Sequence, residues 1–177
     1  QIQTISGALP LLVNLQTLSL GFADDGLGNQ LPKKLACGLV SLKNLQNLVL
    51  DLSWCGITPL GVQKLAGGLP HSLRLFHVNF SMNDLDGGYV LSQLCAALPH
   101  SIRNLELLVN DLQCETLENA AVQSLARSIP LGIEALSLNV SKNIALHGND
   151  FAEAVARTLE NLHSLQHLAL TCQYVYP

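Results

Sequence analysis

Three short turns in this sequence each place a histidine directly before a serine. They are His71-Ser72, His100-Ser101 and His163-Ser164. A histidine beside a serine could act as the base that activates a hydroxyl nucleophile, and imidazoles on neighbouring turns could bind a metal ion. However, a turn copied three times indicates a structural role, and no third ligand is placed near His71 and His100. We interpret the histidines as helix-end residues that hydrogen-bond the last carbonyl groups. We expect no catalytic residue, no metal and no cofactor.

The cysteines are the other side chains with possible chemistry. They are Cys37, Cys55, Cys95, Cys114 and Cys172. Their number is odd and no two have C-x-x-C spacing, which argues against a disulfide framework or a zinc site. The repeat described next gives Cys37 and Cys95 helix-core positions and Cys172 a strand-core position, with Cys114 near an apolar position. We therefore expect reduced, structural cysteines and favour a reducing intracellular compartment.

A repeat that fills the chain must position all these groups. Six copies of one apolar pattern, spaced 28 to 32 residues apart, start at Leu15, Leu45, Leu73, Ile102, Ile133 and Leu165. The second copy, residues 45–52, reads L-x-x-L-x-L-x-L. The last three apolar positions of each copy alternate with period two, so they line one face of a strand. A fixed period in this range is typical of a solenoid, here a single domain over residues 1–177.

A second motif, expected to be helical, comes before five of the strands. Its copies are Leu35–Leu39, Leu65–Leu69, Leu94–Leu98, Leu125–Ile129 and Val155–Leu159. Apolar residues four apart lie on one face of a helix, and a proline follows three of these motifs and ends the helix. Each repeat should therefore run strand, loop, helix, turn. The parallel strands would line the inside of a curve and the helices the outside.

In these features the chain resembles leucine-rich repeat proteins of the ribonuclease-inhibitor-like class. The resemblance covers nearly the whole chain and implies an α/β horseshoe, with a parallel sheet on its concave side and helices on its convex side. The usual motif of the family is L-x-x-L-x-L-x-x-N, whereas these strands have one further L-x step before the Asn position. That variant is similar to the one in protist and algal leucine-rich repeat proteins.

The resemblance also implies a role for one position that follows each strand. There the family has an Asn that hydrogen-bonds loop backbone in neighbouring repeats, a structural ladder. The aligned residues here are Asp25, Cys55, Asn83 and Asn143. Buried backbone groups must be paired, and a short carboxylate, thiol or amide can pair them. The fourth copy has Leu112 instead, and residues 113–119 form an insertion, so we expect an irregular loop there.

Candidate binding residues lie on the outward positions of the strands, which are mostly small and polar. Arg74 and Arg103 lie side by side in the middle of the face, with His77 and Glu106 close by. Arginine is a common binding hot spot, so this cluster is the candidate on the concave face, unless the serines and asparagines merely solvate a sheet. Trp54 directly follows a strand. It could anchor a partner at the loop edge or only shield the ladder.

Composition limits the remaining functional classes. Charged residues make up 12% of the chain and the net charge is −4. The nine lysines and arginines are scattered rather than clustered on one basic face, so we expect no nucleic-acid partner. The longest apolar runs fall far short of the roughly 20 residues of a transmembrane helix. The chain opens inside a repeat and shows no polar terminal caps. We therefore expect a fragment of a longer array, or a piece that a partner caps.

These observations favour a non-catalytic protein–protein interaction module that uses its concave face or its loop edge. An open face neither excludes water nor forms a pocket, so we do not expect an enzyme. The alternative is a structural or peripheral subunit buried in a larger assembly, which the low charge and the missing caps favour. In either case the expected partner is a protein.

Overall fold

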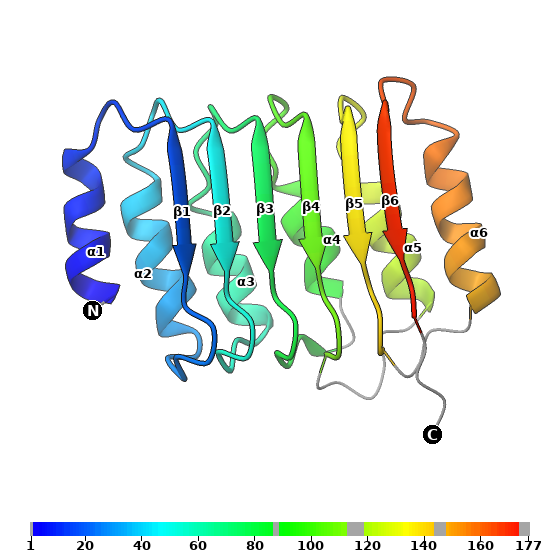
Figure 1. Cartoon of the computed structure of the whole chain (residues 1–177), viewed down its shortest axis with the longest axis horizontal. Coiled ribbons are helices and arrows are strands. Elements are labelled where there is room, and N and C mark those ends of the chain that lie inside the picture. Colours follow the sequence, from blue (N-terminus) through cyan, green and yellow to red (C-terminus); the bar gives the residue numbers. More distant parts are fainter. Residues whose placement is uncertain (1, 87–88, 113–118, 144–147, 174–177) are drawn as a thin grey trace.

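The protein alternates helices and strands along its whole length (Figure 1). The computed structural model describes residues 2–86, 89–112, 119–143 and 148–173. The helices are α1 (Ile2–Ala8), α2 (Gln30–Leu39), α3 (Pro59–Ala66), α4 (Tyr89–Ala96), α5 (Asn119–Ser128) and α6 (Gly148–Leu159), with a 3-10 turn η1 (Leu9–Leu11) after α1. The strands are β1 (Thr17–Gly21), β2 (Asn47–Asp51), β3 (Leu75–Asn79), β4 (Asn104–Leu108), β5 (Ala135–Asn139) and β6 (His167–Thr171).

All six strands join one parallel sheet in chain order, β1 to β6. The register aligns the same position of every repeat. The middle row across the sheet is Ser19, Val49, His77, Glu106, Ser137 and Ala169. The structure thus confirms the predicted α/β leucine-rich repeat solenoid, and each repeat contributes one strand and one helix.

The core is a ribbon between the sheet and the helices, which lie together behind the sheet in Figure 1. On the strand side, Leu48 and Leu50 of β2 are fully buried, and α2 buries Leu31, Leu35 and Leu39 against them. Burying one such side chain contributes about 1.5–3 kcal/mol. Since every helix packs on the same side, the other face of the sheet stays open along its whole width.

The last strand breaks the pattern of burial. Leu168 and Leu170 occupy the same positions as Leu48 and Leu50, yet they are 44% and 39% exposed. Each repeat of a solenoid contacts only its neighbours, and no described strand packs beyond β6. The chain therefore presents apolar core positions at this end of the sheet.

Cys37 and Cys95 were both predicted to lie in the helix core, and the structure confirms only one of these positions. Cys95 is buried as expected, but Cys37 is exposed, so its predicted helix-core position is wrong. Cys37 lies two residues after Leu35, and at 3.6 residues per turn this places it about 200° around α2, away from the core. Cys55 is also buried and Cys172 is half-buried. The four described cysteines form no disulfide with one another, and Cys114 lies outside the described residues.

The His-Ser turns depend on their serines rather than on their histidines. Ser72 Oγ donates to the Leu45 carbonyl at 2.7 Å, and Ser101 Oγ donates to the carbonyls of His71 and Leu73 at 2.8 and 2.6 Å. The side chains of the three turn histidines are exposed and make no hydrogen bond with the described residues. The interpretation of these histidines as helix-end hydrogen-bond donors is therefore wrong. The serine hydroxyl ties each turn to the one before it.

Candidate protein-binding surfaces

Asn83 is the central residue of the ladder beneath the loop edge. Its Oδ1 accepts hydrogen bonds from the backbone N–H of Cys55 at 3.1 Å and of Ile57 at 2.8 Å. Its Nδ2 donates to three carbonyls, those of Leu52 at 2.9 Å, Phe80 at 2.8 Å and Ser81 at 3.2 Å. The buried amide therefore joins the loop of its own repeat to the loop of the preceding repeat, which fixes the backbone that carries the exposed loop residues.

Asn143 repeats this arrangement two repeats later. Its Oδ1 accepts from the Leu112 N–H at 3.1 Å, and its Nδ2 donates to the carbonyls of Val109 and Val140 at 2.8 and 2.7 Å. Each ladder residue thus reaches back to the preceding loop. Leu112 is buried but has no polar side chain to continue the ladder, and the loop predicted to be irregular, 113–119, lies almost wholly outside the described residues.

Cys55 and Asp25 occupy the ladder positions of the first two repeats. The Cys55 thiol donates to the carbonyls of Phe22 at 2.9 Å and Ser53 at 3.3 Å. Burial is the main cause that raises the pKa of Cys55, which keeps the thiol protonated as a donor. Asp25, in contrast, is exposed, and its carboxylate forms no hydrogen bond with the described residues. The ladder role predicted for Asp25 is not seen, because no described strand lies before β1.

The open sheet face brings together two of the predicted binding residues. His77 Nδ1 and Glu106 Oε2 are 3.1 Å apart across β3 and β4, and their side chains are 30% and 41% exposed. The pair lies in a hollow with a volume of about 580 Å³ that extends from Val49 of β2 to β6. Its lining includes the apolar side chains Val49, Leu75, Ala135 and Ala169 and the polar side chains Asn104, Ser137, Gln166 and His167.

The two predicted arginines do not join this hollow. Arg103 turns toward the edge where the strands begin, where its Nε lies 3.5 Å from Glu134 Oε1 and its guanidinium donates to the carbonyls of His100 and Ile102, each at 2.9 Å. Arg74 is exposed, and its side chain forms no hydrogen bond or ion pair with a described residue. The predicted cluster of four is therefore two separate features: the His77–Glu106 contact in the hollow, and Arg74 and Arg103 at the edge beside it.

Trp54 lies at the opposite edge, where the strands end. Its side chain is 57% exposed, and its backbone is left-handed with a φ of 50°. The equivalent residues of other repeats share this backbone: Asp24 (59°), Met82 (60°), Asp111 (51°) and Lys142 (62°). Positive φ is uncommon for residues other than glycine, so its recurrence makes it a feature of the repeat. More than half of the Trp54 side chain is therefore accessible at this edge.

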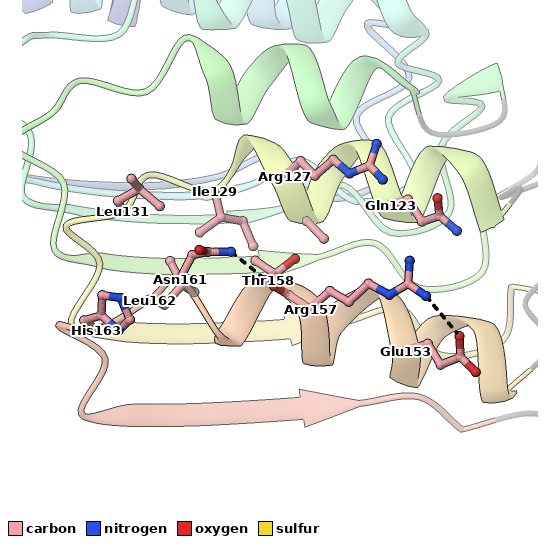
Figure 2. A pocket seen from close by; sticks show the side chains of 11 residues that line it. Gln123, Arg127, Ile129, Leu131, Glu153, Arg157, Thr158, Asn161, Leu162 and His163 are labelled. Atoms are coloured by element: carbon pink, nitrogen blue, oxygen red, sulfur yellow. Dashed lines mark hydrogen bonds and ion pairs between the residues drawn. The ribbon is translucent and has the colours of Figure 1, made fainter.

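A third surface, a groove between α5 and α6, lies on the helical side (Figure 2). Its volume is about 470 Å³. Arg127, Arg157 and Glu153 lie toward one end, and Leu131 and His163 toward the other (Figure 2). Arg157 and Glu153 form an ion pair of 3.7 Å, but both are largely exposed, and such pairs contribute about 0–1 kcal/mol. None of the predicted binding residues lines this groove.

A further row of residues on the open face could have been predicted from the alternation of the strands. The row Thr17, Asn47, Leu75, Asn104, Ala135 and His167 points out of the sheet beside the middle row. These residues directly precede the second apolar position of each copy, so strict period-two alternation places them on the open face. They contribute Leu75 and Ala135 to the apolar lining of the hollow.

Comparison with known proteins supports the fold. The chain is similar to the tropomodulin C-terminal domain of Caenorhabditis elegans, with a TM-score of 0.59 and 15% sequence identity over 90% of this chain and 94% of that one. That domain has a leucine-rich repeat fold. At this level of identity the similarity concerns the fold alone. No protein-family model and no curated protein matches the sequence.

Two further features bear on the class of protein. No helix in the described part of the chain is long and apolar enough to cross a membrane. The described residues also contain no group of three or more histidine, cysteine, aspartate or glutamate side chains that could hold a metal ion.

Proposed function

We propose that this chain is a non-catalytic protein-interaction module, and that a partner protein binds in the hollow of its open sheet face. The observation that carries the proposal is the hollow itself: an apolar floor with a few polar groups around it, on a sheet face that no described element covers. An apolar centre within a polar rim is the common anatomy of protein interfaces. The leucine-rich repeat neighbour also supports a protein partner.

The His77–Glu106 pair supports binding rather than catalysis. No serine, threonine or cysteine side chain hydrogen-bonds to His77 among the described residues. A nucleophile needs a base within hydrogen-bond reach, and this imidazole instead contacts a carboxylate in an open hollow. The half-exposed pair presents a donor and an acceptor to an incoming chain.

The size of the open face indicates that it does not act alone. Six strands spaced about 4.8 Å apart, each five residues of about 3.3 Å, give a face of roughly 400 Å². A stable interface covers about 800 Å² on each partner. A partner that binds stably must therefore also contact an edge of the sheet, and the loop edge with Trp54 is one such surface.

A second candidate function is that of a structural subunit within a larger assembly, favoured by the low share of charged residues, 12%. Size-exclusion chromatography with light scattering separates the two functions. A stable monomer in solution supports the interaction module, whereas aggregation that a partner relieves supports the structural subunit.

We further propose the ribonuclease-inhibitor-like subclass, because a helix of 7 to 12 residues accompanies every strand. We also propose a reducing intracellular compartment, because the described cysteines form no disulfide with one another.

Capture of the partner by matched variants tests the proposed binding face. Ala135→Arg places a long charged side chain in the hollow, and Ala96→Arg makes the same change on the exposed side of α4. Both variants should keep the far-ultraviolet circular dichroism of the wild type. We expect the wild type and Ala96→Arg to capture the same protein from an extract of the source cells, and Ala135→Arg to lose it. Equal capture by both variants would contradict the proposed face.

A further inference from the structure

Two large apolar side chains lie in solvent at the loop edge. Trp54, the single tryptophan of the chain, is 57% exposed, and Met82 is 40% exposed. Tryptophan is among the residues most enriched in binding hot spots, and methionine adapts to irregular apolar partners. Since burial of apolar surface is the main favourable term in protein association, these two side chains form a candidate contact point.

The backbone sets these residues in one continuous row. The N–H of Asp24 donates to the Ser53 carbonyl at 3.1 Å, so Asp24 lies beside Trp54, which follows Ser53. In the same way, the N–H of Trp54 donates to Ser81 at 2.9 Å, which places Met82 next in the row.

The row continues past Met82 by the same contacts. The N–H of Met82 donates to the Asn110 carbonyl at 2.9 Å, which adds Asp111, and the N–H of Asp111 donates to Ser141 at 3.0 Å, which adds Lys142. The apolar pair therefore has an aspartate on each side. We call the sequence Asp24, Trp54, Met82 and Asp111 the loop-edge row.

Negative charge surrounds the apolar pair. Besides the two aspartates of the row, the same loops carry the exposed carboxylates of Asp25, Asp84 and Asp86. None of these five carboxylates forms an ion pair with a described residue. Lys142, a basic residue, follows Asp111 just beyond the loop-edge row, two positions from Met82. The negative charge therefore remains available to a partner, at distances comparable to the Debye length of about 8 Å at physiological ionic strength.

We propose that the loop-edge row binds a basic segment of a partner protein that has an apolar side chain at its centre. This inference rests on the proposed function and assigns the chemistry of the partner. The apolar centre of the segment packs between Trp54 and Met82, and its flanking lysines or arginines approach Asp24 and Asp111. The three strand spacings between those two aspartates span roughly 14 Å. An extended segment covers that distance with about four residues, so its cations should stand four residues apart.

Charge and apolar area have separate effects in this arrangement. Complementary charges at a rim mainly speed association and select partners, so an acidic segment with the same apolar centre should be excluded. The apolar contact should set the lifetime of the complex. The proposal therefore predicts binding that weakens with salt and fails without the indole.

The fluorescence of Trp54 reports this binding directly because the chain has no other tryptophan. We suggest titrating the whole chain with a synthetic peptide that has a central leucine pair between lysines and arginines. The control peptide replaces every basic residue with glutamate. We expect the basic peptide to shift Trp54 emission to shorter wavelength, with an effect that weakens as salt is added, and the acidic peptide to leave the emission unchanged. The same response to both peptides, or no response to either peptide, would overturn the proposal.

Variants locate the binding, measured by the anisotropy of the labelled basic peptide. Trp54→Asn removes the indole and keeps a residue type that tolerates a positive φ; it should weaken binding about 30-fold or more, as expected for a hot spot. The double variant Asp24→Asn with Asp111→Asn should weaken binding at low salt and remove most of its salt dependence. Glu160→Gln removes an exposed carboxylate beyond the end of α6 and should bind like the wild type. Unchanged affinity of Trp54→Asn would contradict the proposal.

The two proposals fail in different ways. If the basic peptide does not bind but Ala135→Arg still loses the captured partner, the inference about the loop edge is wrong and the proposed function stands. If the peptide binds and Ala135→Arg keeps the partner, the sheet face is wrong and the loop edge is the binding surface.

Discussion

Removal of the Asn83 side chain should destabilise the protein more than removal of any exposed polar side chain. The amide is 1% exposed and makes five hydrogen bonds to backbone groups of two repeats. In Asn83→Ala the N–H groups of Cys55 and Ile57 lose the only acceptor that the described structure gives them. An unsatisfied buried group costs about 1–3 kcal/mol.

The three backbone carbonyls that accept hydrogen bonds from Asn83 Nδ2 are affected to different degrees. The Ser81 carbonyl keeps the N–H of Trp54 at 2.9 Å, so its loss is small, while those of Leu52 and Phe80 lose the Asn83 donor. Two backbone N–H groups left without an acceptor, and two carbonyls that lose one donor each, together cost about 3–5 kcal/mol of stability. We expect Asn83→Ala to lower the free energy of unfolding by that amount.

Asn110→Ala is the matched control for this prediction. The Asn110 side chain lies one repeat further on, and its Oδ1 is buried without a hydrogen-bond partner among the described residues. The same chemical change there should cost less than about 1 kcal/mol, because no hydrogen bond is lost. Urea denaturation followed by circular dichroism measures both variants, and hydrogen exchange should show faster exchange at Cys55 and Ile57 in Asn83→Ala alone. A loss for Asn83→Ala no larger than that for Asn110→Ala would refute the ladder argument.

Three further predictions concern single side chains. Ser101→Ala removes two hydrogen bonds and should lower stability in urea by about 1 kcal/mol. The control His100→Ala changes an exposed side chain and should alter stability by less than about 0.5 kcal/mol. Equal effects of the two changes would show that the histidine also stabilises the turn. Burial raises the pKa of Cys95 to about 12, so mass spectrometry at neutral pH should find Cys37 alkylated in the native protein and Cys95 unmodified. Because the thiol of the unfolded chain ionises first, the stabilising contribution of Cys95 should fall as pH rises from about 9 toward 12; a urea midpoint for Cys95→Ala that falls as steeply as that of the wild type would contradict this. Trp54→Asn should leave stability unchanged or raise it by up to about 1 kcal/mol, since a left-handed backbone is costly for a large side chain and the indole is exposed; a clear loss of stability would show that the indole supports the fold.

The fold could be predicted from the sequence because the copies of the repeat can be aligned with one another. Period-two alternation identifies the buried face of one strand, and six copies fix which residue of each strand lies beside which residue of the next. His77 and Glu106 therefore came together as expected, although the motif spacing varies from 28 to 32 residues.

The errors arose where a side chain depends on more than its repeat position. Cys37 shares a motif with Leu35, but its direction follows the helical angle rather than membership of the motif. Arg103 aligns with Arg74, yet its long side chain folds back onto nearby carbonyls. Repeat spacing does not predict the conformation of a long side chain. Asp25 aligns with Asn83, but a ladder residue pairs with the preceding loop, and no described strand comes before β1.

The exposure of Trp54 could not be predicted for a different reason. A tryptophan after a strand can fold over the ladder or remain accessible, and the apolar pattern of the repeat does not distinguish the two. Positive φ is usually signalled by glycine, asparagine or aspartate. Asp24 and Asp111 carry that signal at this position of the repeat, whereas tryptophan, methionine and lysine at the equivalent positions do not.

Photo-crosslinking from the centre of the open face tests whether a protein binds there. A photoreactive amino acid in place of Ser137 lies in the hollow, and the same group in place of Ala96 lies on the outer side of α4. In extracts of the source cells, we expect a discrete adduct with one protein from position 137 and none from position 96. Adducts from position 96 alone, or from neither position while the protein remains folded, would contradict a protein-binding sheet face.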